Sequence, residues 1–186
     1  DTHVSEFELN NAEIIQTDYI VNTLPLTLTA KLLNPVPYQE IIESANSIKY
    51  RNLILGIIGL SRPQFTSNAS IYFPDEEVPF TRIYEPKNRS NSMAPKDQTS
   101  LVVECPCFDN DSIWSMDETQ IRKTIEPHLK KLPFYQSSEL NLFKSFKIPY
   151  AYPVLEKNKI KHAELLNNYF ENFSNMSMIG RSALFR

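Results

Sequence analysis

The segment Phe80–Ser90, FTRIYEPKNRS, carries the charged and aromatic side chains best suited to bind a ligand. Side chains alternate along an extended strand, which places Arg82 and Tyr84 on the same face. An arginine on an inner strand needs a carboxylate partner or an anion, because an unpaired buried charge is costly. Two interpretations therefore stay open. Arg82 pairs with Glu104 or Glu85 and stabilises the sheet, or it binds a phosphate or carboxylate.

A pair of tyrosines in YAYPV, Tyr150–Val154, is the second candidate for ligand contact. Tyrosine offers a flat apolar ring and one hydroxyl, a combination that suits sugar and flavin pockets. The same pair can cap a hydrophobic core with its hydroxyls in water. The residues alone leave both interpretations of Tyr150 and Tyr152 open.

The other reactive side chains give no site. Cys105 and Cys107 in ECPC would need two further ligands to hold a metal, and no second cysteine pair exists. We interpret them as structural thiols and expect no metal. Ser182 lacks the second glycine of a hydrolase nucleophile elbow. No catalytic residue is identified.

The composition excludes several classes of protein. The formal net charge is −3 at pH 7, whereas nucleic-acid and anionic-membrane binding favour basic surfaces. The longest apolar run, LILGIIGL, covers 8 residues, whereas a membrane-spanning helix needs about 20. The beginning of the chain is acidic and polar, unlike a signal peptide, so we expect a cytoplasmic location.

Glycine is scarce, with only 3 residues in 186. Phosphate-binding loops of the GxGxxG and GxxxxGK types need several glycines to bring backbone N–H groups against phosphate. The sequence therefore holds no P-loop and no complete dinucleotide-binding motif.

The patterns around these residues predict an α+β fold with a largely antiparallel, mixed sheet of about five to six strands and flanking helices. Apolar spacing indicates a helix over 41–48 and another over Asn158–Phe173. A further helix is expected to begin after a capping box formed by Asp117 and Gln120. Pro127 is expected to kink or divide this helix. Strands are predicted within Ala12–Leu26 and at Arg51–Leu60, Ser70–Phe73, Pro79–Tyr84, Ser100–Cys105, Leu142–Tyr150 and Met176–Ile179.

Several segments, in order, resemble the FAD-dependent amine-oxidase-like superfamily, in the branch of UDP-galactopyranose mutase and protoporphyrinogen-oxidase-like proteins. The segments are TDYIVNTLPL, IKYRNLILGIIGL, IYFPDEEVPFTRIYEPKNRS, LVVECPCFDNDSIW, YAYPV and NMSMIGRSALFR. Each is a weak signal alone, and their order and spacing make the resemblance specific. It extends from about Thr17 to Arg186.

The resemblance implies that residues 1–186 are a single domain, the substrate-binding part of a larger flavoprotein. It lacks the Rossmann glycine motif and the C-terminal flavin segment of that family. Residues 1–26 would be crossover strands, 27–174 the sheet and helices, and 175–186 the start of a flavin-contacting segment. By the same resemblance, Gly180, Arg181 and Thr23 would bind FAD, and Arg82, Tyr84, Asn88 and Tyr152 the substrate. Ser182-Ala183 departs from relatives that carry a glycine there.

The activity implied is that of a FAD-dependent oxidoreductase or mutase acting on a nucleotide sugar or related metabolite, with this part alone inactive and not binding FAD. One alternative is a non-catalytic module that binds an anion or sugar. Another is an interaction domain that forms a homodimer through apolar surface at Leu184 and Phe185. A strand–GxGxxG–helix pattern upstream of Asp1 in the gene would favour the enzyme.

Overall fold

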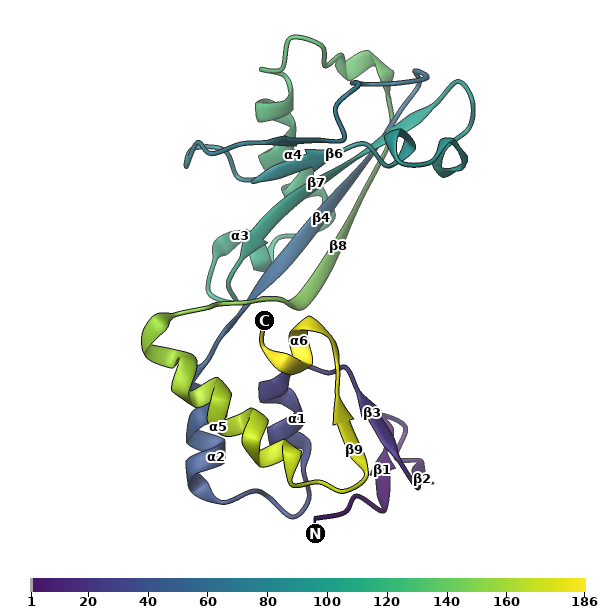
Figure 1. Cartoon of the computed structure of the whole chain (residues 1–186). Coiled ribbons are helices and arrows are strands. Elements are labelled where there is room, and N and C mark those ends of the chain that lie inside the picture. The colour runs from purple at the N-terminus through teal and green to yellow at the C-terminus, as the bar shows by residue number, and fades with distance from the viewer. Residues whose placement is uncertain (1) are drawn as a thin grey trace. The chain divides into compact units, whose positions relative to one another are not determined.

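The structure is a computed structural model that describes residues 2–186 (Figure 1). The chain forms two compact units, one of residues 2–50 with Tyr150–Arg186 and the other of Arg51–Pro149. Each unit has its own cluster of buried apolar residues. We call them the helical unit and the sheet unit. The assignment of the whole chain to one substrate-binding domain stays a prediction.

The sheet unit is built on a five-stranded sheet of order β5-β6-β7-β4-β8. Its strands are β4 (Tyr50–Leu60), β5 (Ser70–Tyr72), β6 (Arg82–Tyr84), β7 (Thr99–Cys107) and β8 (Leu140–Pro153). The pairs β5–β6, β6–β7 and β4–β7 are antiparallel. With helices in both units, these pairs confirm the predicted α+β class.

One face of this sheet is buried against α4 (Glu118–Leu129). Ile121, Ile125 and Leu129 of the helix are fully buried, as their spacing predicts, and they pack with inward residues of β4, β6 and β7. The capping box forms as predicted, since Asp117 accepts from the backbone of Gln120 and Gln120 accepts in return. Pro127 does not divide the helix, which extends two residues past it. Because Pro127 lies close to the C-terminal end of α4, it affects only the last turn of the helix.

Close approach of β4 and β8 explains one of the glycines. A Cβ on Gly59 would lie 2.9 Å from Leu142 Cβ and closer still to Asn141 Oδ1. On the opposite face, a Cβ on Gly56 would meet Ile125 Cδ1 at 3.0 Å and the Phe143 ring at 3.7 Å. Leu142 therefore lies on the face of Gly59, and Phe143 lies on the face of α4.

Short segments complete the sheet unit. They are η1 (Pro86–Asn88), η2 (Asn91–Met93), α3 (Ser112–Ser115) and η3 (Ser137–Glu139). The η1 and η2 turns follow β6, the strand that carries Arg82 and Tyr84.

The helical unit packs α1 (Leu26–Leu32), α2 (Gln39–Ser47) and α5 (Ile160–Glu171), the last preceded by η4 (Lys157–Lys159). Leu26, Ile41, Leu166 and Phe170 are buried among them. The helices α2 and α5 lie where their apolar spacing predicts them.

Two small sheets complete this unit (Figure 1). Strands β1 (Glu6–Glu8) and β2 (Ile14–Gln16) pair antiparallel. Strand β3 (Ile20–Asn22) pairs in parallel with β9 (Met176–Met178), although more than 150 residues separate them in the sequence. The last element is α6 (Gly180–Leu184). Across residues 2–186, none of the helices has the length and apolarity to span a bilayer.

Candidate functional site

Arg82 and Glu104 form a two-pronged ion pair across β6 and β7. Arg82 Nε donates to Glu104 Oε2 at 2.9 Å and Nη2 donates to Oε1 at 2.5 Å. The two residues are direct partners in the strand register. Their side chains are 26% and 9% exposed, and this hydrogen bonding raises the pKa of Arg82 above its usual range. Of the two carboxylates considered from sequence, Glu104 is therefore the partner.

Two tyrosine rings lie near the guanidinium of Arg82. Its Cζ lies 5.2 Å from the ring centroid of Tyr84 and 6.0 Å from that of Tyr72, both within the range of cation–π attraction. Tyr72 is the register partner of Arg82 on β5, so the two share a face of the sheet. A second guanidinium, that of Arg89, lies 5.3 Å from the Tyr84 centroid.

The face that carries Arg82 is the one opposite α4. Ile83 is fully buried on the α4 side, whereas the neighbouring Arg82 and Tyr84 are half-buried. Spacing of two from Leu142 puts Phe146 and Ile148 of β8 on this face as well. Large apolar side chains are exposed there, with Phe146 at 57%. We call this side the open face of the sheet.

Asn88, predicted as a substrate ligand, is committed to holding a loop. Its Nδ2 donates to the carbonyls of Thr66 at 2.6 Å and Asn68 at 2.9 Å, and its Oδ1 accepts from Gln64. Its role in substrate binding stays a prediction.

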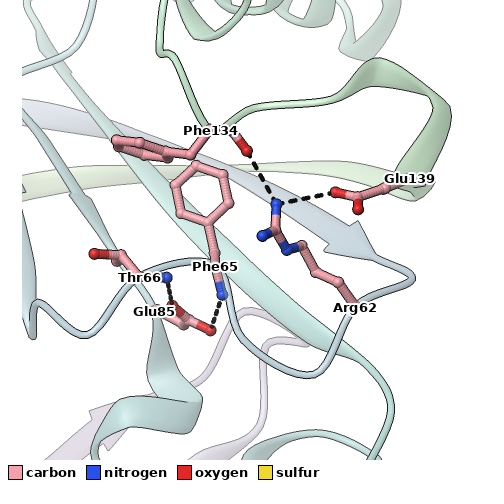
Figure 2. A network of polar contacts seen from close by, with 6 residues as sticks. All are labelled: Arg62, Phe65, Thr66, Glu85, Phe134 and Glu139. Carbon is pink, nitrogen blue, oxygen red and sulfur yellow. Dashed lines mark hydrogen bonds and ion pairs between the residues drawn. The ribbon is translucent and has the colours of Figure 1, made fainter.

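A buried carboxylate lies beside this loop (Figure 2). Glu85 is fully buried and accepts from the backbone N–H groups of Phe65 and Thr66, each at 2.9 Å, and from the Thr99 hydroxyl at 2.6 Å. Figure 2 also shows Arg62 bonded to the Phe134 carbonyl and to Glu139. Glu85 therefore fixes the end of β6 to the segment after β4 instead of pairing with Arg82.

In the helical unit, Arg181 and Tyr152 are in contact. Arg181 Cζ lies 4.5 Å from the Tyr152 ring centroid, and its Nη2 donates to the Ala151 carbonyl at 3.0 Å. A residue predicted to bind the cofactor thus lies against one predicted to bind the substrate. Arg181 is exposed, so its remaining donors are accessible.

The parallel pair β3–β9 brings two predicted cofactor segments to one edge. Thr23 follows β3 directly, and Gly180 comes two residues after β9. The N–H of Ile179 donates to the carbonyl of Asn22, which extends the pairing. Gly180 has φ +83°, which favours glycine, and no atom lies within 4 Å of where a Cβ would stand. Thr23 and Gly180 are both exposed at this carboxyl edge.

Tyr50 fixes the two helices that begin at this edge. Its hydroxyl accepts from the N–H of Leu26 at 3.0 Å and donates to the carbonyl of Ser182 at 2.5 Å. Its ring lies edge-to-face with Phe185 and Tyr150. Burial raises the pKa of Tyr50 to about 12. Phe185 is buried by this packing, which contradicts the exposed apolar surface expected at Phe185 for a homodimer.

The two cysteines are buried side chains of β7. Burial raises the pKa of Cys105 to about 12 and that of Cys107 above its ordinary value, so both thiols stay protonated at neutral pH. The described part of the chain, 2–186, shows no group of three His, Cys, Asp or Glu side chains that could hold a metal ion.

The candidate residues thus fall into two groups, one in each unit. Arg82 and Tyr84 lie together in the sheet unit with Tyr72 and Arg89, which the sequence reasoning did not identify. Tyr152 belongs to the helical unit, with Arg181, Gly180 and Thr23. The sequence does contain a signal for Tyr72. If the two predicted strands Ser70–Phe73 and Pro79–Tyr84 are paired as a hairpin, Tyr72 can lie opposite Arg82.

Comparison with known proteins begins with a family model described as UDP-galactopyranose mutase, which matches residues 11–133. No curated protein sequence matches the chain. Among solved structures, a reduced UDP-galactopyranose mutase is similar with TM-score 0.74 and 17% identity, over 96% of this chain. A putative protoporphyrinogen oxidase from Exiguobacterium sp. 255-15 has TM-score 0.71 and 12% identity, over 95% of this chain. A putrescine oxidase variant has TM-score 0.52 and 11% identity, over 75%.

These similarities cover only part of the solved proteins. The chain spans 38% of the mutase, 39% of the protoporphyrinogen oxidase and 30% of the putrescine oxidase. At such low sequence identity, the solved structures show the fold alone. The family model matches well over half of this chain and therefore carries the assignment to a family.

Proposed function

The chain belongs to the UDP-galactopyranose mutase family, and from this membership we propose that it is the substrate-binding part of a FAD-dependent oxidoreductase or mutase. The proposed substrate is a nucleotide sugar or a related metabolite. The observation that carries the proposal is the open face of the sheet, where Arg82 is paired with Glu104 and lies near the rings of two tyrosines. Such a face offers charge and flat apolar surface together, as sugar and nucleotide ligands require.

In this proposal Arg82 binds a phosphoryl oxygen of the substrate. Glu104 occupies Nε and one Nη2 hydrogen, and the guanidinium has five donors in all. Tyr72 takes part in a further hydrogen bond with this group, and in this proposal the donors that remain bind a ligand on the open face, while the ion pair fixes the plane of the group. Tyr84 would contact the substrate beside it, and Tyr152 and Asn88 remain proposed ligands.

The residues at the carboxyl edge of β3–β9 fit a bound FAD. Cofactors in α/β sheets bind outside the carboxyl ends of parallel strands, and Thr23 and Gly180 are exposed at such an edge. The open space where a Cβ of Gly180 would stand allows close approach of a ligand to the backbone. Arg181 supplies a cation beside this edge for the phosphates or the flavin.

When bound, FAD would supply hydride transfer, which amino-acid side chains cannot provide, or covalent attack through its N5. The contribution of this chain would be to orient the substrate and to hold its charge. Arg82 would fix the position of a phosphoryl group, and Tyr152 would be kept in place by its contact with Arg181. No side chain of this chain is assigned a proton transfer.

The test is the flavin content of the full-length gene product. We expect a flavin absorbance spectrum in the purified or FAD-reconstituted protein. Arg181→Ala should raise the Kd for FAD by about tenfold, the effect of one charge-assisted contact. Arg122→Ala, in an exposed helix pair with Glu126, is the matched control and should change nothing. A full-length protein that stays colourless after reconstitution would overturn the proposal.

A further inference from the structure

We propose that Arg89 is a second phosphoryl-binding residue of the open face and supplies the net positive charge that Arg82 lacks. This inference rests on the proposed function, because it concerns the ligand bound beside Tyr84. It is carried by two guanidinium groups near one tyrosine ring, of which only Arg82 has a carboxylate partner among residues 2–186.

The charge of Arg82 is already compensated. Its pair with Glu104 is close and two-pronged, so the two formal charges cancel within the site. A phosphoryl group that approached Arg82 alone would meet the Glu104 carboxylate as well. Binding of an anion there needs a further cation.

Arg89 is exposed, and its Cζ lies 5.3 Å from the ring centroid of Tyr84. Within residues 2–186, the ion pairs are five in number, and Arg89 takes part in none of them. A guanidinium carries five N–H donors, and none of the hydrogen bonds found within residues 2–186 uses a side-chain donor of Arg89. Those N–H groups match the geometry of a phosphoryl group, to which arginine binds through two parallel hydrogen bonds.

The backbone that carries Arg89 is held in place by hydrogen bonds. The N–H of Arg89 donates to the Pro86 carbonyl at 2.9 Å, which closes the η1 turn. Lys87 Nζ donates to three carbonyls, those of Pro95, Lys96 and Gln98, at 2.6–2.9 Å. The bonds of Glu85, shown in Figure 2, hold the same turn to the segment after β4. The bond from Asn88 Nδ2 to the Thr66 carbonyl does the same. Arg89 therefore extends from a fixed turn, which lowers the cost of ordering it on a ligand.

Like charges near one ring also argue for an anion. Arg82 and Arg89 both lie about 5 Å from the Tyr84 centroid. The Glu85 carboxylate is next in sequence to Tyr84, but it is fully buried and held by backbone and side-chain donors, so it is not available to Arg89. A phosphoryl group bound beside Tyr84 would compensate the charge of Arg89, while that of Arg82 is compensated by Glu104.

The experiment titrates the 186-residue chain with inorganic pyrophosphate in low salt and follows the arginine Nε–Hε signals by NMR. Affinities in the range of about 1 mM are measurable in this way. We expect saturable shifts of Arg82 and Arg89. Arg89→Gln should raise the Kd about tenfold, and Arg89→Lys should restore part of it, because the charge returns without the planar fork.

The matched control is Arg51→Gln. Arg51 is also an exposed arginine of the sheet unit, stacked 5.5 Å from the Phe108 centroid, and it should leave the Kd unchanged. If Arg82 shifts while Arg89→Gln behaves as Arg51→Gln does, the inference is wrong and the proposed function survives. If all three arginines shift alike, the binding is non-specific and the inference is wrong. If neither Arg82 nor Arg89 shifts, the proposed phosphoryl role of Arg82 fails as well.

Discussion

Arg82 illustrates how far a single residue can be interpreted from its neighbours in the sequence. The alternation of side chains along the strand predicts that Arg82 and Tyr84 lie on the same face. The cost of an unpaired buried charge predicts that Arg82 has a partner. The structure then assigns Glu104, because it is the direct register partner on β7. Tyr72 and Arg89 were not predicted as neighbours of Arg82. The position of Tyr72 depends on the register of the β5–β6 hairpin, and that of Arg89 depends on the η1 turn.

Loss of one partner from the Arg82–Glu104 pair should destabilise the chain. Arg82→Gln removes two charge-assisted hydrogen bonds and leaves the Glu104 carboxylate, 9% exposed, without its cation. We expect the free energy of unfolding to fall by about 2 kcal/mol in urea denaturation. Arg122→Gln breaks an exposed helix pair, with Arg122 at 44% exposure, and should cost less than about 0.5 kcal/mol. Equal losses in the two variants would show that the pair contributes no special stability.

Tyr50 should make the stability of the chain depend on alkaline pH. Its pKa is raised to about 12 in the folded state by burial, against about 10 in an unfolded chain. Its protonated form is therefore favoured by folding. That contribution is complete below about pH 10 and declines as the pH rises toward about 12.

The measurement compares wild type with Tyr50→Phe. At neutral pH the variant should be less stable by about 1 kcal/mol or more, because the Leu26 N–H and the Ser182 carbonyl lose their partner. Above about pH 10 the difference in the free energy of unfolding should shrink. A difference that stays constant with pH would contradict the assignment. The subtraction removes the other tyrosines, which titrate in both proteins.

At the scale of elements, strong periodicity was a reliable guide. The capping box, α4, α2, α5 and the long strands β4, β7 and β8 lie where apolar spacing and turn residues predict them. The helix α1 was missed because Leu24-Pro25 indicated only the end of a strand. Pro25 in fact precedes the helix, where its missing N–H costs nothing. The parallel pairing of β3 with β9 is long-range, and three-residue strands carry no local signal for it.

The contact between β4 and β8 should be sensitive to a single methyl group. Gly59→Ala places a Cβ within 2.9 Å of Leu142 Cβ, which requires one strand to shift. We expect a loss of about 1–3 kcal/mol in the free energy of unfolding. Gly56→Ala is the matched comparison on the same strand. Its nearest neighbour is Ile125 Cδ1 at 3.0 Å, the end of a flexible side chain, so the loss should be smaller. The reverse order would contradict the proposed packing.

At the scale of the whole molecule, the order of several weak motifs identified the family, and the family model over residues 11–133 confirms it. The division into two compact units was not predicted, because it depends on which distant segments pack together. Leu26 of α1 and Phe170 of α5, for example, share one core although 144 positions separate them. The chain spans 38% of the mutase and 39% of the protoporphyrinogen oxidase, and its activity stays a proposal.

The most direct test of the account adds UDP to the FAD-loaded full-length protein and measures the change in flavin absorbance. We predict a saturable change in the wild type. In Arg82→Gln, the Kd for UDP should rise by about tenfold or more while the FAD content, which reports correct folding, is retained. Arg82→Lys should fall between the two, because it keeps the charge and loses the fork. A wild-type spectrum that does not respond to UDP, or an Arg82→Gln response equal to wild type, would contradict the assignment of the open face as a substrate site.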